Sequence, residues 1–282
     1  MFAHPASAAQ TIKMSTTTIT RDSGLLCYLL PEFAKDSGIT VQVIAKGAGA
    51  AIRDGQDGNV DVIFVHDPAR EMKFVEEGWG TKRYEVMHND FVLVGPASDP
   101  AGIKNSKDVM AALKNIAEKQ KIFVSRGDDS GTHSKELGLW KASGVLLQKT
   151  EQTVKKGGKD TVVTFEAPKG AWYLSIGQGM GKTLLMAEEK EGYALSDRGT
   201  YIKHKFGKTP PTSLEIIVEG DKGLANPYGV IPVNPAKYPN TKVREATTFA
   251  EWLVSPKGQA LIANYKLEGQ QLFFPDAITD AK

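Results

Sequence analysis

The segment Ser125–His133, with the sequence SRGDDSGTH, brings several kinds of hydrogen-bond donor together. It follows the strand-like residues Ile122–Val124 and precedes a helical pattern, so we expect a loop that ends at a helix N-terminus. Free backbone N–H groups lie at such an end, and Arg126, Ser130 and Thr132 add side-chain donors. This set suits a small anion. Taken by itself, the segment fits equally well a helix that is merely capped by Ser130 or Thr132.

Three further segments contain hydroxyl groups or glycines that could approach a ligand. Residues 15–24 read STTTITRDSG, and a threonine-rich strand followed by an ordinary helix cap explains them without a ligand. Residues 46–52 read KGAGAAI, where Gly47 and Gly49 permit close backbone approach. They form no dinucleotide fingerprint because Ile52 stands at the third glycine position. Residues 177–183, GQGMGKT, form no phosphate-binding loop because Ile176 replaces its first glycine.

Catalytic and metal-binding patterns are weak in this sequence. Ser130 lacks the nucleophile elbow because position 128 is aspartate, and His133 lies only three residues away on the same loop or helix. A hydrolase that uses Ser130 and His133 therefore remains only an alternative. The five histidines form no paired ligand motif. The single cysteine, Cys27, excludes a disulfide within the chain and is expected to be buried and inert.

Composition and charge point to an ordinary globular protein. The net charge of +2 provides no basic stripe for nucleic acid, and no apolar run approaches the roughly 18 residues that a membrane span requires. Within the N-terminal residues MFAHPASAAQ, the stretch Ala6-Ser7-Ala8 is similar to the end of a cleaved secretory signal. Residues 1–10 are therefore interpreted as a signal remnant or an artificial tail, and we expect a periplasmic or exported, cell-surface-associated protein.

Strand and helix patterns alternate along the chain, which favours an α/β fold with mainly parallel sheets. Short apolar or β-branched runs indicate strands at residues 40–45, 60–65, 91–94, 122–124, 161–165 and 214–218. Helices are expected at 25–35, at 68–77, at 107–119 with Ser106 as its cap, and from Pro256 onward. Because no flexible linker divides the chain, hinge closure is favoured over independent domains.

Taken together in this order, the motifs resemble a known family. From about residue 11 onward the chain is similar to the tungstate-binding receptors of bacterial ABC importers, within the phosphate- and molybdate-type periplasmic binding proteins. The stretches that carry the resemblance are TTTITRDSGLL (16–26), DVIFVHDP (61–68), HNDFVLVGP (88–96), FVSRGDDSGTH (123–133), WYLSIGQGMGKTL (172–184), LSDRGTY (195–201), NPYGVIPVNP (226–235) and FFPDA (273–277).

The resemblance implies a type II periplasmic-binding-protein fold with two α/β lobes. Lobe I would contain residues 11–93 and 206–282, and lobe II residues 94–205. Crossing strands near 91–96 and within 199–218 would join them. The ligand, tungstate or else molybdate, would lie in the cleft, and a membrane permease would recognise the closed form. A phosphate or sulfate receptor remains an alternative. We expect a monomer without cofactor, catalytic residue or bound metal ion, the tungsten being held only as an oxyanion.

The resemblance also implies the residues that bind the ligand. One lobe would contribute Thr17, with Thr16 and Thr18, and backbone N–H groups at Gly49 or Ala50. The other would contribute Arg126, Thr132 and Ser130.

One position departs from the family, which has a serine where Ile19 stands; strand alternation would place Ile19 on the same face as Thr17. Because carboxylates repel oxyanions, we expect Asp22, Asp128 and Asp129 to cap helices or brace Arg126.

Overall fold

The computed structural model describes residues 10–156 and 159–277 and divides into two compact units. Unit 1 contains the residues up to Asn89 and those from Asn226 onward, and unit 2 is Asp90–Ala225. Strands β4 (Tyr84–Gly95) and β11 (Ala225–Pro232) carry the chain from one unit to the other. The expected signal remnant lies outside the described residues, apart from Gln10 at the start of β1.

The sheet of unit 1 has parallel strands at its centre. Strand β1 (Gln10–Thr17) pairs in parallel with β2 (Ile39–Lys46) and with β3 (Val62–Val65). On the far side of β3, β11 runs antiparallel, and β14 (Phe274–Pro275) pairs antiparallel with the first part of β4. All four residues of β3 are buried, as expected for a strand that is covered on both faces.

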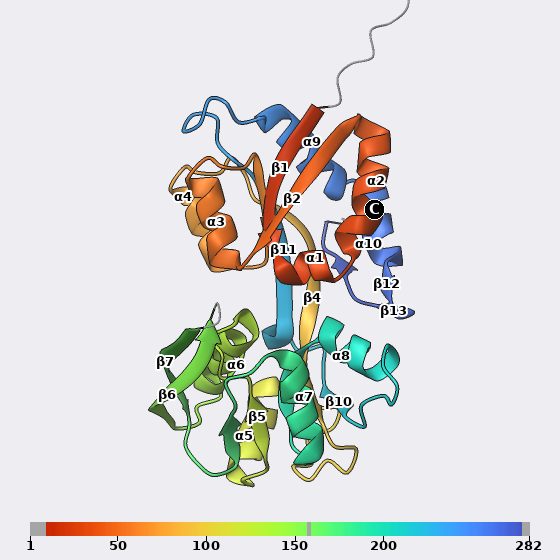
Figure 1. The fold of residues 1–282 in the computed structure, drawn as a ribbon. Coiled ribbons are helices and arrows are strands. Elements are labelled where there is room, and N and C mark those ends of the chain that lie inside the picture. Colours follow the sequence, from red (N-terminus) through yellow and green to blue (C-terminus); the bar gives the residue numbers. More distant parts are fainter. Residues whose placement is uncertain (1–9, 157–158, 278–282) are drawn as a thin grey trace, which may run out of the picture. The chain divides into compact units, whose positions relative to one another are not determined.

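Helices cover both faces of this sheet. Figure 1 shows α3 and α4 on one side of the strands and α2, α9 and α10 on the other. The elements of unit 1 not yet given are α1 (Thr18–Asp22), α2 (Leu25–Ser37), α3 (Ala48–Gln56), α4 (Pro68–Glu76), α9 (Val243–Leu253), α10 (Pro256–Asn264), β12 (Lys266–Leu267) and β13 (Gln270–Gln271). Since β1, β2 and β3 are parallel, the helices that follow them, α1, α3 and α4, begin at the same edge of the sheet.

Unit 2 also has parallel strands at its centre, and these strands are shorter than those of unit 1. Strand β5 (Phe123–Ser125) pairs in parallel with β8 (Tyr173–Ser175), while β9 (Ala194–Asp197) and β10 (Glu215–Val218) pair antiparallel with the second part of β4. A hairpin of β6 (Leu147–Lys156) and β7 (Lys159–Pro168) completes the strands. The helices are α5 (Val109–Glu118), α6 (Gly131–Ala142), α7 (Met180–Glu189), α8 (Arg198–Phe206) and the short η1 (Lys222–Leu224). Helices α6 and α7 therefore begin at one edge, after β5 and β8.

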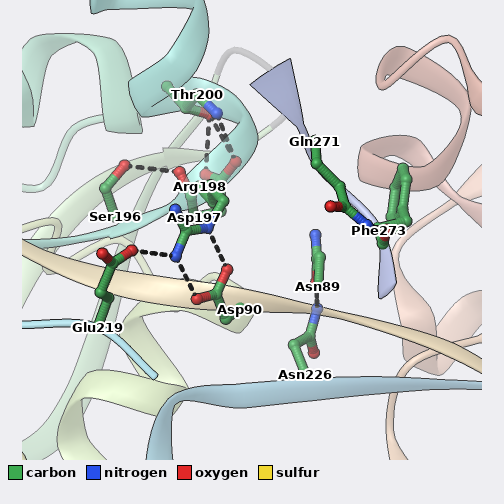
Figure 2. Close-up of polar contacts among 10 residues, drawn as sticks. All are labelled: Asn89, Asp90, Ser196, Asp197, Arg198, Thr200, Glu219, Asn226, Gln271 and Phe273. Carbon is green, nitrogen blue, oxygen red and sulfur yellow. Dashed lines mark hydrogen bonds and ion pairs between the residues drawn. The ribbon is translucent and has the colours of Figure 1, made fainter. Parts of the chain in front are cut away.

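The predicted α/β class is confirmed, with parallel pairing at the centre of each unit and antiparallel pairing by the connecting strands. The expected return to lobe I at residue 206 differs from the structure, in which residues 206–225 belong to unit 2. The reason is that β10 pairs with Leu93–Gly95 of β4. In addition, Arg198 at the start of α8 binds both Asp90 on β4 and Glu219 just after β10, as Figure 2 shows.

The expectation for Cys27 was wrong, because its side chain is exposed. The apolar face of α2 is formed by Leu25, Leu26, Leu29 and Phe33, and Cys27 lies on the other side of the helix. Within the described ranges, no helix is both long and apolar enough to cross a membrane.

Candidate functional site

The three threonines at the end of β1 have different surroundings. Thr16 is fully buried and donates its hydroxyl to the Phe64 carbonyl at 2.6 Å, so it belongs to the sheet interior. Thr17 ends the strand and caps α1, since its Oγ1 accepts from the Thr20 N–H at 3.2 Å. Thr18 is exposed at the first position of the helix. Thr17 and Thr18 therefore both lie at the sheet edge where helices begin, Thr17 buried and Thr18 exposed.

Ile19 does not follow the strand alternation that was expected for it. The strand ends at Thr17, and Ile19 is the second residue of α1, where it is half-buried. Strand alternation therefore does not apply to Ile19, because helical geometry already begins at Thr18.

His66 is a neighbour of Thr17 that the sequence analysis did not select. It follows β3 directly, and its Nε2 lies 3.1 Å from Thr17 Oγ1. Its Nδ1 lies 3.1 Å from Oδ1 of Asn226, at the start of the returning chain. The signal was available in principle, since a polar residue that ends a buried parallel strand lies at the same edge as the ends of its neighbours.

Helix α3 begins at the same edge. Gly47 is its N-cap, and the N–H groups of Ala50 and Ala51 both donate to the Gly47 carbonyl at 3.0 Å. The N–H groups of Ala48 and Gly49 remain in the open first turn of the helix. A Cβ atom at Gly49 would lie 2.6 Å from Nη1 of Arg70, so the glycine makes room for a guanidinium beside this helix end.

In unit 2, the loop after β5 holds Arg126 in place. Its Nε and Nη2 donate to Oδ2 of Asp128 at 3.1 and 2.6 Å, and both side chains are mostly buried. The other oxygen of Asp128 accepts from the Ser130 N–H at 3.2 Å. The expectation that Asp128 braces Arg126 is confirmed. Asp22, by contrast, forms an exposed ion pair with Arg21 at 2.7 Å.

The loop leads into the N-terminus of α6. Ser130 caps the helix, with its Oγ accepting from the His133 N–H at 3.2 Å, as the capping interpretation predicted. Thr132 lies in the first turn with 2% of its surface exposed, and its Oγ1 has no hydrogen-bond partner among the described residues. Leaving a buried hydroxyl unsatisfied costs about 1–3 kcal/mol, so this atom marks a place where a polar ligand fits.

His133 is buried in the same turn but does not meet the Ser130 hydroxyl through its ring. Its Nδ1 accepts from the Asp129 N–H at 3.1 Å, and the ring packs edge-on against Phe165. Because Nδ1 accepts this bond, the proton of the ring lies on Nε2, and burial lowers the pKa of His133 below its usual value. Since Ser130 Oγ bonds to the backbone N–H of His133 and not to its ring, the pair lacks the serine–imidazole hydrogen bond of a hydrolase.

A second loop lies against Arg126, between β8 and α7. The Gln178 N–H donates to the Arg126 carbonyl at 3.0 Å, and a Cβ atom on Gly127 would lie 2.0 Å from Ser175 Oγ. That hydroxyl is also buried without a partner in the part of the chain that the structure describes. Helix α7 follows, capped by Gly179. The sequence analysis rejected a nucleotide motif here and missed that the loop lies beside Arg126.

A buried carboxyl group anchors α6 beneath this edge. Ser125 and Tyr173 donate to the two oxygens of Glu136 at 2.7 Å, and Trp140 Nε1 donates at 3.1 Å. These contacts tie α6 to the last residue of β5 and the first residue of β8. Burial raises the pKa of the Glu136 carboxyl to about 7, even though all three donors favour the charged form.

Each unit thus presents donors at the carboxyl edge of its parallel strands. Unit 1 has the Thr17 hydroxyl, which is already bonded to Thr20 and His66, and the first turn of α3; unit 2 has Arg126, Thr132 and the first turn of α6. Groups of these types suit an anion that only accepts hydrogen bonds. Among the described residues, no group of three or more His, Cys, Asp and Glu side chains could hold a metal ion.

Comparisons with known proteins agree with this chemistry. A family model described as a PBP superfamily domain matches residues 3–257. The tungstate-binding protein TupA of Peptoclostridium acidaminophilum is 47% identical over 96% of this chain and 87% of its own length. The solved structure of TupA from Desulfovibrio alaskensis G20 matches with a TM-score of 0.85 at 44% identity, over 96% of this chain and 100% of that one. A tungstate ABC transporter structure from Geobacter sulfurreducens matches with a TM-score of 0.71 at 46% identity, over 92% and 100%.

Proposed function

This chain belongs to the PBP superfamily and, within it, to the family of tungstate-binding proteins, and on that premise we propose that it captures tungstate and delivers it to the permease of an ABC importer. The observation that carries the proposal is the guanidinium of Arg126. It is fixed by Asp128 beside a helix N-terminus whose buried Thr132 hydroxyl has no partner among the described residues.

The proposed chemistry is binding rather than catalysis. Tungstate is a tetrahedral dianion with oxygen atoms that only accept, and each hydrogen bond to such a charge contributes about 1.5–3 kcal/mol. Arg126 supplies fixed positive charge, and the helix ends supply dipoles that are already oriented. Asp128, the acid nearest to the guanidinium, is neutralised by it and accepts a backbone N–H with its second oxygen.

In the proposed complex, one ion takes donors from both units. Unit 1 contributes the Thr17 hydroxyl and the Gly49 N–H, and Thr18 and Ala50 lie at the edge of the proposed site. Unit 2 contributes Arg126 and Thr132, with Ser130 serving mainly as the cap of α6. Thr16 supports the sheet, because its hydroxyl already donates to the Phe64 carbonyl. Hinge movement at β4 and β11 would bring the two sets to the ion, and the permease would recognise the loaded form.

The proposed setting follows from the same premise. A receptor that feeds an importer acts outside the cytoplasmic membrane, so we place the protein in the periplasm or at the cell surface. It acts there as a monomer, without a cofactor and without enzymatic activity.

Calorimetric titration of the purified protein with tungstate, molybdate, sulfate and phosphate in turn tests this function. Tungstate and molybdate have nearly the same size and charge, so both are expected to bind tightly, with sulfate and phosphate much weaker. Tight binding of phosphate or sulfate without binding of tungstate would assign the site to a different oxyanion. Absence of binding by all four anions would remove the proposed function altogether.

A further inference from the structure

A chain of side-chain hydrogen bonds in unit 1 joins the Thr17 hydroxyl to the two strands that leave the unit. Thr17 Oγ1 lies 2.7 Å from Thr20 Oγ1 and 3.1 Å from His66 Nε2. The opposite ring nitrogen, Nδ1, lies 3.1 Å from Oδ1 of Asn226. The Asn226 amide in turn donates to Asn89 Oδ1 at 2.7 Å, as Figure 2 shows. Asn89 and Asn226 are the last and first residues of unit 1 at the chain crossings.

The orientation of the Asn226 amide, with its nitrogen toward Asn89, assigns the tautomer of the imidazole. Since the nitrogen of the Asn226 amide donates to Asn89, the oxygen faces His66, and an amide oxygen can only accept. His66 Nδ1 therefore carries a proton and donates. In a neutral imidazole Nε2 must then accept, so the Thr17 hydroxyl donates its proton to His66. In this state Thr17 has no proton to offer to an anion.

A second proton on the ring reverses the bond to Thr17. Nε2 then donates, and Thr17 Oγ1 accepts both from it and from the Thr20 N–H. Both acceptor positions of the hydroxyl are filled, and its own proton is released for another acceptor. Thr20 Oγ1 lies within reach, but a dianion is the stronger acceptor because the hydrogen bond is charge-assisted.

We propose that His66 is a positioning residue whose second proton turns the Thr17 hydroxyl toward the bound oxyanion, so that tungstate is taken up together with about one proton. The inference rests on the proposed function, because it requires Thr17 to contact the ligand. Linkage fixes its sign: if the ligand favours the protonated ring, protonation of the ring tightens ligand binding by the same factor.

Several charged groups on the elements packed around His66 have an opposite charge beside them. Asp67, which caps α4, pairs with Arg70 at 2.5 Å, and the buried Glu71 pairs with Arg83 at 2.6 Å. The remaining groups on these elements are Arg21 paired with Asp22 on α1, Asp54 of α3 paired with Lys46, Lys73 of α4 paired with Glu77, Arg53 of α3, Glu76 of α4 and Tyr228 of β11, whose ring centroid lies 4.7 Å from that of His66 with the rings tilted. Burial raises the pKa of Glu71 to about 7, so Glu71 is the competing source of a proton near neutral pH.

The test is the pH dependence of tungstate binding, followed by calorimetry from about pH 6 to about pH 8.5 in buffers of different ionisation enthalpy. In the wild-type protein we expect the affinity to fall by up to about tenfold per pH unit above the titration of His66, with about one proton taken up. In His66→Gln the affinity for tungstate should not change with pH over this range. The same holds for Thr17→Val, which has no hydroxyl to turn.

Two matched variants separate His66 from other groups. His88→Gln removes a half-exposed histidine of the same unit, bonded to Asp276 at 2.6 Å, and should keep the wild-type slope. Glu71→Gln removes the competing carboxyl and should keep the slope as well. Nitrogen NMR of His66 can be measured on the wild-type protein, so this test does not depend on the folding of a variant. It should show a proton on Nδ1 alone in the free protein above neutral pH, and protons on both ring nitrogens when tungstate is bound.

Tungstate binding without proton uptake would overturn the role of His66 and leave the proposed function standing. A slope that survives in His66→Gln would assign the proton to another group and also overturn it. If the wild-type protein gives no heat with tungstate at any pH, the proposed function fails, and the role of His66 fails with it.

Discussion

Arg126 is the residue at which the chemistry of the site can be measured most directly. Its guanidinium binds Asp128 through Nε and Nη2, while the proposed ligand takes the rest of its donors. Arg126→Ala should weaken tungstate binding by about 10- to 150-fold, because a charge-assisted hydrogen bond contributes about 1.5–3 kcal/mol. Arg244→Ala, which removes an exposed arginine from α9, is the control and should bind as the wild-type protein does. Unchanged affinity in Arg126→Ala would exclude contact with the ion.

Thr132 offers a test in which binding and stability change in opposite directions. Its buried Oγ1 has no partner in the described part of the chain, so Thr132→Val should leave the free protein equally stable or up to about 1 kcal/mol more stable. The same variant should bind tungstate about tenfold more weakly. Chemical denaturation and calorimetry measure the two effects.

Thr183→Val is the matched control for this prediction. Thr183 is also fully buried and near the start of a helix in unit 2, but its hydroxyl donates to the Gly179 carbonyl at 3.2 Å. Its replacement should lower stability by about 1 kcal/mol. A loss of stability in Thr132→Val as large as that in Thr183→Val would mean that the Thr132 hydroxyl has a partner in the free protein.

At the scale of elements, the buried Glu136 carboxyl holds α6 in place and makes the stability of the protein depend on pH. Because burial raises its pKa from 4.5 to about 7, the folded state binds its proton more tightly than the unfolded chain does. The stability from this group is fully present below about pH 4.5 and is lost as the pH rises to about 7, an effect of at most about 3 kcal/mol.

Glu136→Gln should therefore flatten the dependence of unfolding free energy on pH between about 4.5 and 7. Denaturant unfolding at several pH values measures it. Tungstate binding at constant pH should change little, since Glu136 lies beneath the site and holds Ser125 and Tyr173 rather than the ion. An unchanged pH dependence in this variant would show that Glu136 is ionised throughout this range.

The elements themselves could be predicted wherever one local signal dominated. Helix α4 begins at Pro68 and α10 at Pro256, because proline suits the first turn of a helix. At α5 the expected cap, Ser106, was wrong, since Asp108 accepts from the Ala111 N–H and caps the helix. A serine and an aspartate two residues apart provide equivalent signals, and packing decides between them.

At the scale of the whole molecule, the proposal that one ion contacts both units predicts that binding protects backbone amides of both units from hydrogen exchange. Tungstate should slow hydrogen exchange of the backbone amides in the first turn of α3, in unit 1, and in the first turn of α6, in unit 2. Hydrogen exchange measured with and without tungstate tests this expectation. With tungstate at 100 times its dissociation constant, the added stability should reach about 2.7 kcal/mol. Protection confined to one unit would contradict a shared ion and would leave the site within that unit.

The limits of prediction from sequence are clearest at the site. The loop 125–133 and its helix were predictable because strand, glycine and cap signals agree within about 10 residues. Which hydroxyls face the edge was not: Thr16 and Thr17 are neighbours, yet one donates into the sheet and the other caps a helix. That difference arises because β1 ends at Thr17, where pairing with β2 ends as well.

The sequence by itself determined the α/β class, most strands and helices, and the donor types of the site, because these depend on periodicity, capping and side-chain chemistry within a short stretch. Only the tertiary structure decided that His66 contacts Thr17, that the loop after β8 lies beside Arg126, and that residues 206–225 stay with unit 2. Each of these depends on which strands pair in which register. Strand pairing joins residues far apart in the chain, and no local pattern contains it.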